Sequence, residues 1–396
     1  MYNGWISDRE AIESECGIES VLNNFSSGVG RDVTVAIIKS LVHQKSASKE
    51  LFNSEKDLEW TMDVICFGLT MPLTDMELET IKNCVYLYLD WSSVFSSKPK
   101  PGIPCQIVRN KEHYFAKMLK HLTNMFIPRE SSTTNYQNNF CSRILSDIKS
   151  LVQEGNMGKS SSEDVLRFYL GISGRLLSQP PMKGGLADML CEQLINSLIT
   201  VWLHVSCYYF PSPTLWCTLQ EEFQTWRHNH ILILQWNKLT YVLTRKVLAI
   251  IFGPSYPLPS LYKNDQTEDI ILPPNMSDDI VVQCWFRFLH CMGNPVDLTN
   301  KTIIANTPNF AMYGLEHNQD PASHPSLKSL PQSFLKAMQG VSVLVKMFLG
   351  ASVQDTRSSS ILSQSFRGDR KSATLGATES HVASVFANKA ATVPGK

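Results

Sequence analysis

Residues 277–295 have the sequence SDDIVVQCWFRFLHCMGNP. Ser277 is a favoured helix N-cap, and Asp278 and Asp279 place negative charge in the first turn, where the helix dipole favours it. Apolar side chains then recur at helical spacing and form one wide face. Gly293 and the Asn-Pro pair that follows it stop a helix. The pattern predicts a helix that starts after Ser277, ends before Gly293 and buries one face in a core.

Helical periodicity extends to both sides of this stretch. Apolar stripes recur at residues 78–89, 115–126, 144–152, 165–176 and 190–205. Thr74 and Glu77 have the spacing of a capping box ahead of the first of these stripes. A last helix is predicted to begin at Pro331, to end at Gly350 and to bury Phe334, Met338, Val341, Val345 and Phe348.

Alternating patterns typical of strands are scarce, and segments 103–108 and 307–325 are predicted to be irregular. The sequence therefore predicts an all-α fold, either an irregular helical array or a HEAT-like α-solenoid.

Two regions differ in composition. Residues 1–350 carry the helical pattern and are predicted to form one helical domain. Residues 351–396 are dominated by small, polar and basic residues, which bury too little apolar surface to offset the entropy of ordering, so a disordered tail is expected. In this segment Arg367, Arg370 and Ser372 have the spacing that basic-directed kinases recognise, which makes Ser372 a candidate phosphorylation site.

Charge and cysteine usage limit the class of protein. Lys+Arg and Asp+Glu both number 36, so no overall field steers the chain to nucleic acid. The ten cysteines are dispersed without a CxxC pair, and the N-terminus lacks a signal sequence. The most apolar stretch, residues 198–210, is too short to span a bilayer. We expect a cytoplasmic protein with reduced cysteines, no nucleic-acid partner and no transmembrane segment.

No recognised catalytic motif is present: the sequence contains no P-loop, no GxSxG and no HExxH. His204 and Cys207 could supply two zinc ligands, but a second pair is missing. His228 and His230 could act as general bases, yet no nucleophile stands beside them. We expect no catalytic residue, no cofactor and no metal site. A cryptic hydrolase using His204 or His228 is kept as an alternative.

A long block at residues 285–298, WFRFLHCMGNPVDL, carries a family resemblance. Other blocks of the chain resemble the same family and occur in the family's order, among them VGRDV at 29–33 and EWTMDVICFGLTMPL at 59–73. Together they closely resemble the N-terminal region of the Ral GTPase-activating protein subunit beta family, the non-catalytic partner in the RalGAP complex. The resemblance covers nearly all of residues 1–350.

The resemblance implies a helical scaffold that joins a catalytic alpha subunit, the heterodimer accelerating GTP hydrolysis by Ral-type small GTPases. In the family the catalytic asparagine belongs to the alpha subunit, so no residue of this chain is expected to have a catalytic role. The leading hypothesis is a non-catalytic regulatory or scaffold subunit, and the alternative is a stand-alone helical-repeat adaptor with another partner. Arg287 and His290, on the rim of the helix after Ser277, are the candidate partner interface. The chain length fits either a fragment of a longer protein or a short form that competes for the partner.

Overall fold

The computed structural model describes residues 7–43, 52, 54–129, 133–178, 180, 182–256 and 270–350. Every regular element in these residues is a helix, and none of them forms a strand. The prediction of an all-α fold is confirmed. Residues 351–396, where the tail and Ser372 were predicted, lie outside the described residues.

The helices follow one another with short connections. The first eight are α1 (Arg9–Ser14), α2 (Ser27–His43), α4 (Glu55–Thr70), α5 (Leu78–Ser92), α6 (Cys105–Arg109), α7 (Lys111–Leu122), α8 (Thr134–Gln153) and α9 (Lys159–Leu177). After them come α10 (Leu186–Tyr208), α11 (Pro213–Thr225), α12 (His230–Phe252), α13 (Asp278–Cys291), α14 (Lys301–Ala305), α15 (Pro308–His317) and α16 (Leu330–Leu349). Short 3₁₀ turns are η1 (Val21–Asn24), η2 (Ser93–Phe95), η3 (Thr123–Phe126), η5 (Pro295–Thr299), η6 (Pro321–Ser323) and η7 (Pro325–Ser329).

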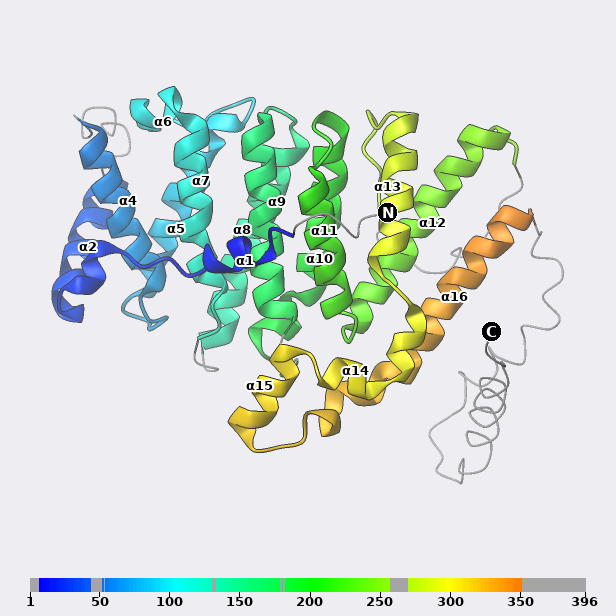
Figure 1. Cartoon of the computed structure of the whole chain (residues 1–396). Helices are drawn as coiled ribbons and strands as arrows, with labels where there is room; N and C mark the ends of the chain where they lie inside the picture. Colours follow the sequence, from blue (N-terminus) through cyan, green and yellow to red (C-terminus); the bar gives the residue numbers. More distant parts are fainter. Residues whose placement is uncertain are drawn as a thin grey trace.

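The helices stand side by side in a row that runs from α2 and α4 at one end to α12 and α16 at the other (Figure 1). Helices close in sequence pack on each other, as α2 does on α4 and α12 on α13, and α10 joins α8 and α9 to α12. The short helices α14 and α15 lie to one side of this row (Figure 1). The arrangement is an irregular helical array, and a HEAT-like repeat within it stays a prediction.

The apolar helix α10 runs through the centre of the core. It has 23 residues and is long and apolar enough to cross a membrane, which corrects the expectation from residues 198–210 alone, because the apolar pattern continues back to Leu186. Within the fold, however, 61% of its most apolar window is buried against other helices. Leu194, Leu198 and Trp202 are almost completely inaccessible to solvent. The packing of α10 is that of a core helix.

Helix α13 has the predicted limits. Ser277 is its N-cap in an extended conformation, without a side-chain capping bond, and Gly293 adopts a left-handed φ of 68° just after its end. Phe288 and Trp285 fix the helix on α12, because Trp236 Nε1 donates to the Phe288 carbonyl at 2.7 Å and Trp285 Nε1 donates to Thr244 Oγ1 at 2.9 Å.

Three local predictions were wrong. Thr74 and Glu77 form no capping box, because the Glu77 carboxylate is paired with Arg31 of α2. Helix α5 begins at Leu78, and Glu77 is its N-cap residue. Residues 105–109 form α6, and residues 308–317 form α15, where irregular segments were expected. In both cases a proline lies at or just before the first helical turn, where its fixed φ suits a helix and its missing N–H is not needed.

Helix α16 begins at Leu330, one residue before the predicted start at Pro331, and ends at Gly350 as predicted, but its orientation differs from the prediction. Met338, Val345 and Phe348 are exposed, while Phe334 and Val341 are only partly buried. The inward side consists of Ser333, Ala337 and Gly340, with Leu330 and Met347 at the two ends.

Small residues bring α16 close to α12. A Cβ at Gly340 would overlap the side chain of Asn237, whose Nδ2 donates to the Lys336 carbonyl at 2.9 Å. Because α16 packs through this small-residue side, its large apolar side chains are left facing outward.

Candidate interaction surface

The histidine and cysteine pairs singled out in the sequence do not assemble a metal site. No group of three or more His, Cys, Asp or Glu side chains in the described residues is placed to hold a metal ion. Cys207 Sγ contacts the Leu203 carbonyl at 3.2 Å inside α10, and burial lowers the pKa of the half-buried His204. Both side chains are accounted for by packing on α10.

His228 and His230 line a hollow of about 240 Å³ together with Ser326 and Ser329. The ring of His228 is buried edge-on against Phe310, with the ring centroids 5.0 Å apart. These serines could not be linked to the histidines by sequence, since nearly a hundred residues separate them.

The two serine hydroxyls form hydrogen bonds within their own segment of the chain. Ser326 Oγ lies 2.7 Å from His324 Nδ1, and Ser329 Oγ donates to the Ser326 carbonyl at 2.8 Å. The backbone N–H of Ser326 donates to the same His324 nitrogen at 3.2 Å and so completes the cap of η7. This geometry gives the hydrolase alternative no support.

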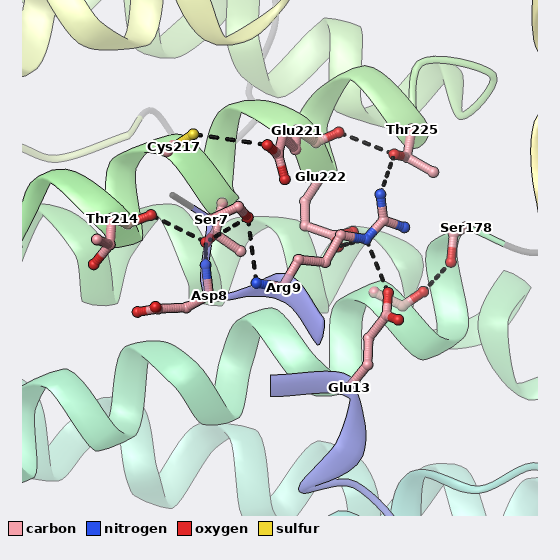
Figure 2. Close-up of polar contacts among 12 residues, drawn as sticks. Ser7, Asp8, Arg9, Glu13, Ser178, Thr214, Cys217, Glu221, Glu222 and Thr225 are labelled. Carbon is pink, nitrogen blue, oxygen red and sulfur yellow. Dashed lines mark hydrogen bonds and ion pairs between the residues drawn. The ribbon is translucent and has the colours of Figure 1, made fainter. Parts of the chain in front are cut away.

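A partly buried ionic cluster joins two distant parts of the chain. Residues 7–14, which we call the N-terminal strap, cross α9 and α11, and Figure 2 shows Arg9 between Glu13 and Glu222. Arg9 Nε lies 2.8 Å from Glu13 Oε1 and 2.9 Å from Glu222 Oε1. Next to this pair, the backbone N–H of Asp8 donates to Thr218 Oγ1 at 3.0 Å. These contacts fasten the strap to α11.

Glu222 is buried, at 2% exposure, and Gly174 of α9 leaves room for its carboxylate. Burial raises the pKa of the Glu222 carboxyl to about 7, and the Arg9 guanidinium opposes part of that rise. A perturbed carboxyl can mark a functional site, but here the carboxylate is paired with Arg9 of the same chain. The arrangement serves to hold the strap, and nothing in the sequence signalled it, because its members are 213 residues apart.

The predicted interface residues Arg287 and His290 lie on the outward side of α13. The Arg287 guanidinium lies over the rings of Phe210 and Trp216, with its Cζ 4.8 Å and 5.7 Å from the two ring centroids. His290 is exposed, and its ring lies against Phe286 with the centroids 4.6 Å apart.

Arg287 is thus held in place by aromatic side chains while part of it remains accessible. A preformed basic and aromatic patch of this kind is typical of protein interfaces, in which Arg, Trp and Phe are enriched. Its role as the interface stays a prediction. The sequence did not indicate that Phe210 and Trp216, which come from other elements, complete the patch.

Comparison with known proteins places this array in context. The sequence model of the RALGAPB N-terminal domain matches residues 133–254, which run from α8 to the end of α12. The Ral GTPase-activating protein subunit beta of Rattus norvegicus is 38% identical to the chain over 361 residues, or 89% of its length. This chain resembles the N-terminal region of Ral GTPase-activating protein subunit beta.

The proteins of the same name from Mus musculus and Homo sapiens show the same identity over the same share of the chain. The chain spans about a quarter of these relatives, 24% of each. No solved structure matches the chain significantly. The resemblance to the beta subunit that the sequence blocks indicated is confirmed.

Proposed function

We propose that this chain is a non-catalytic regulatory or scaffold module of a Ral GTPase-activating complex, which supports GTP hydrolysis by Ral-type GTPases through pairing with a catalytic alpha subunit. The observation that carries the proposal is the 38% identity to the beta subunit over 89% of the chain. Identity that extends across the whole helical array is typical of proteins that keep the same scaffold, which supports transfer of the scaffold role more than any single motif does.

We further propose that the patch of Arg287 and His290, backed by Phe210 and Trp216, takes part in binding the alpha subunit. An arginine already fixed on aromatic rings loses little side-chain entropy when it binds, and that favours affinity. Its planar donors can pair with a carboxylate of the partner.

The test is co-purification of the tagged chain with the alpha subunit. We expect the wild-type chain to retain that subunit and the double variant Arg287→Ala/His290→Ala to retain less. The control is Arg143→Ala/His317→Ala, which removes an exposed arginine and an exposed histidine elsewhere. Absence of binding by the wild-type chain would sink the proposal, and an unbiased pull-down that recovers only other proteins would favour the adaptor alternative. Equal retention by both double variants would move the interface away from α13.

A cytosolic location belongs to the same proposal. All ten cysteines are free, and most are buried in the core, as is usual in a reducing compartment. Cell fractionation with thiol labelling tests this, and recovery of disulfide-linked chain from a secretory fraction would contradict it.

A further inference from the structure

The outward side of α16 is an apolar stripe with no described helix packed on it. Leu335, Met338, Val345 and Leu349 are 50%, 40%, 51% and 75% exposed, and Ser342 between them is exposed too. We call these five residues the α16 seam. Helix α16 lies at the end of the array, and its main contacts are with α12, η5 and η7 (Figure 1). Exposed apolar side chains that are grouped on one side of a helix are typical of a surface that binds a partner.

The spacing of the seam indicates what covers it. Its members lie at successive steps of three, four, three and four residues, which is the a and d pattern of a helix that packs against another helix. The seam extends for about 21 Å at 1.5 Å per residue, enough for two heptads of a partner. A flat apolar surface such as a membrane needs no such spacing, and the serine in the middle of the stripe weakens insertion into lipid.

Charge narrows the choice of partner helix. Helix α16 carries two basic side chains, Lys336 and Lys346, and no Asp or Glu. Lys346 is exposed and follows Val345, so it lies at an e position beside the seam. Charges at e positions pair with charges on the partner helix. The complementary partner is therefore acidic along its flanks.

The same charges argue against two other occupants. A second copy of this chain would bring like-charged helices together, which is unfavourable at close range. Residues 351–396 contain more basic than acidic residues and so do not complement the seam either.

We propose that the α16 seam is a docking site for an amphipathic helix of another protein, with apolar residues at its a and d positions and acidic residues on its flanks. The inference goes beyond the proposed function and stands apart from it, because it concerns α16 rather than α13 and its test contains no GTPase-activating subunit.

The experiment uses the whole chain and two synthetic helical peptides of three heptads. Both peptides have Leu at a and d, and one has Glu and the other Lys at the e and g positions. Binding is measured by fluorescence anisotropy of the labelled peptide at low salt. We expect saturable binding of the acidic peptide at least about tenfold tighter than that of the basic peptide.

Variants locate the site. Met338→Glu/Val345→Glu places charge in the seam and is expected to weaken binding of the acidic peptide by at least about tenfold. Leu315→Glu makes the same kind of change at an exposed leucine of α15 and is expected to leave binding unchanged. Circular dichroism confirms that both variants keep the helical content of the wild type.

Four results would overturn the proposal. They are equal affinity for the acidic and basic peptides, unchanged binding by the seam variant, a wild-type dimer in sedimentation that the seam variant abolishes, and binding to vesicles of phosphatidylserine and phosphatidylcholine in place of the acidic peptide. The dimer would assign the seam to a second copy, and vesicle binding would assign it to a membrane.

Discussion

Replacing Glu222 by glutamine should change how the stability of the array depends on pH. The pKa of the Glu222 carboxyl is raised from 4.5 to about 7 by burial, against the opposing effect of Arg9. A pKa raised in the folded state means that the contribution of this group to stability is complete below pH 4.5. It is then lost as the pH rises through about 7.

The size of this loss follows from the raised pKa. Each pKa unit corresponds to about 1.4 kcal/mol, so the rise amounts to about 3 kcal/mol of free energy of unfolding. Exposure of 2% at Glu222 means that solvent screens little of this energy. Glutamine has nearly the same shape and does not ionise, so Glu222→Gln should remove the loss. Relative to wild type, the variant should gain about 3 kcal/mol between pH 4.5 and pH 8.

The assay is urea unfolding followed by the helical circular dichroism signal at several pH values across that range. Glu221→Gln is the matched control, because it makes the same change one residue away and leaves the contact between Arg9 and Glu222 in place. A Glu222→Gln variant with the same pH dependence as wild type would refute the reasoning, and so would an equal effect of Glu221→Gln.

Other outcomes follow from packing and from the proposed role. Gly340→Ala should destabilise the fold by about 1–3 kcal/mol, because the added Cβ would displace the side chain of Asn237. In Gly28→Ala the added Cβ meets open space, so this variant should not be destabilised. Thermal unfolding of both variants checks this. Cys105 is exposed and should react with iodoacetamide well before Cys66, since burial raises the pKa of the Cys66 thiol to about 12; peptide mass spectrometry gives the order, and early labelling of Cys66 would contradict it. The chain alone should not accelerate GTP hydrolysis by Ral in a single-turnover assay, and acceleration at stoichiometric concentration would disprove the non-catalytic role.

The sequence was most informative where a local signal determines the structure. The limits of α13 follow from Ser277 and Gly293, and those of α16 from Pro331 and Gly350, because caps and breakers act within a few residues. Periodicity also identified the all-α class.

The sequence was least informative where residues far apart in the chain determine the local structure. Periodicity showed that α16 is apolar but not which side faces inward, since the close approach at Gly340 depends on Asn237 of α12. The capping box before α5 failed because Glu77 pairs with Arg31, more than forty residues away. The patch around Arg287 is completed by Phe210 and Trp216, whose proximity no local pattern encodes.

The N-terminal strap has a consequence for biosynthesis. Arg9 leaves the ribosome long before Glu222 and Thr218 are translated, and at roughly 5–20 residues per second the delay is about 10–40 seconds. Throughout that time the strap lacks its contacts with α11, and the side of α9 that packs on α11 is uncovered. The nascent chain therefore exposes apolar helix surface that chaperones recognise, and the array can be completed only after α11 has emerged.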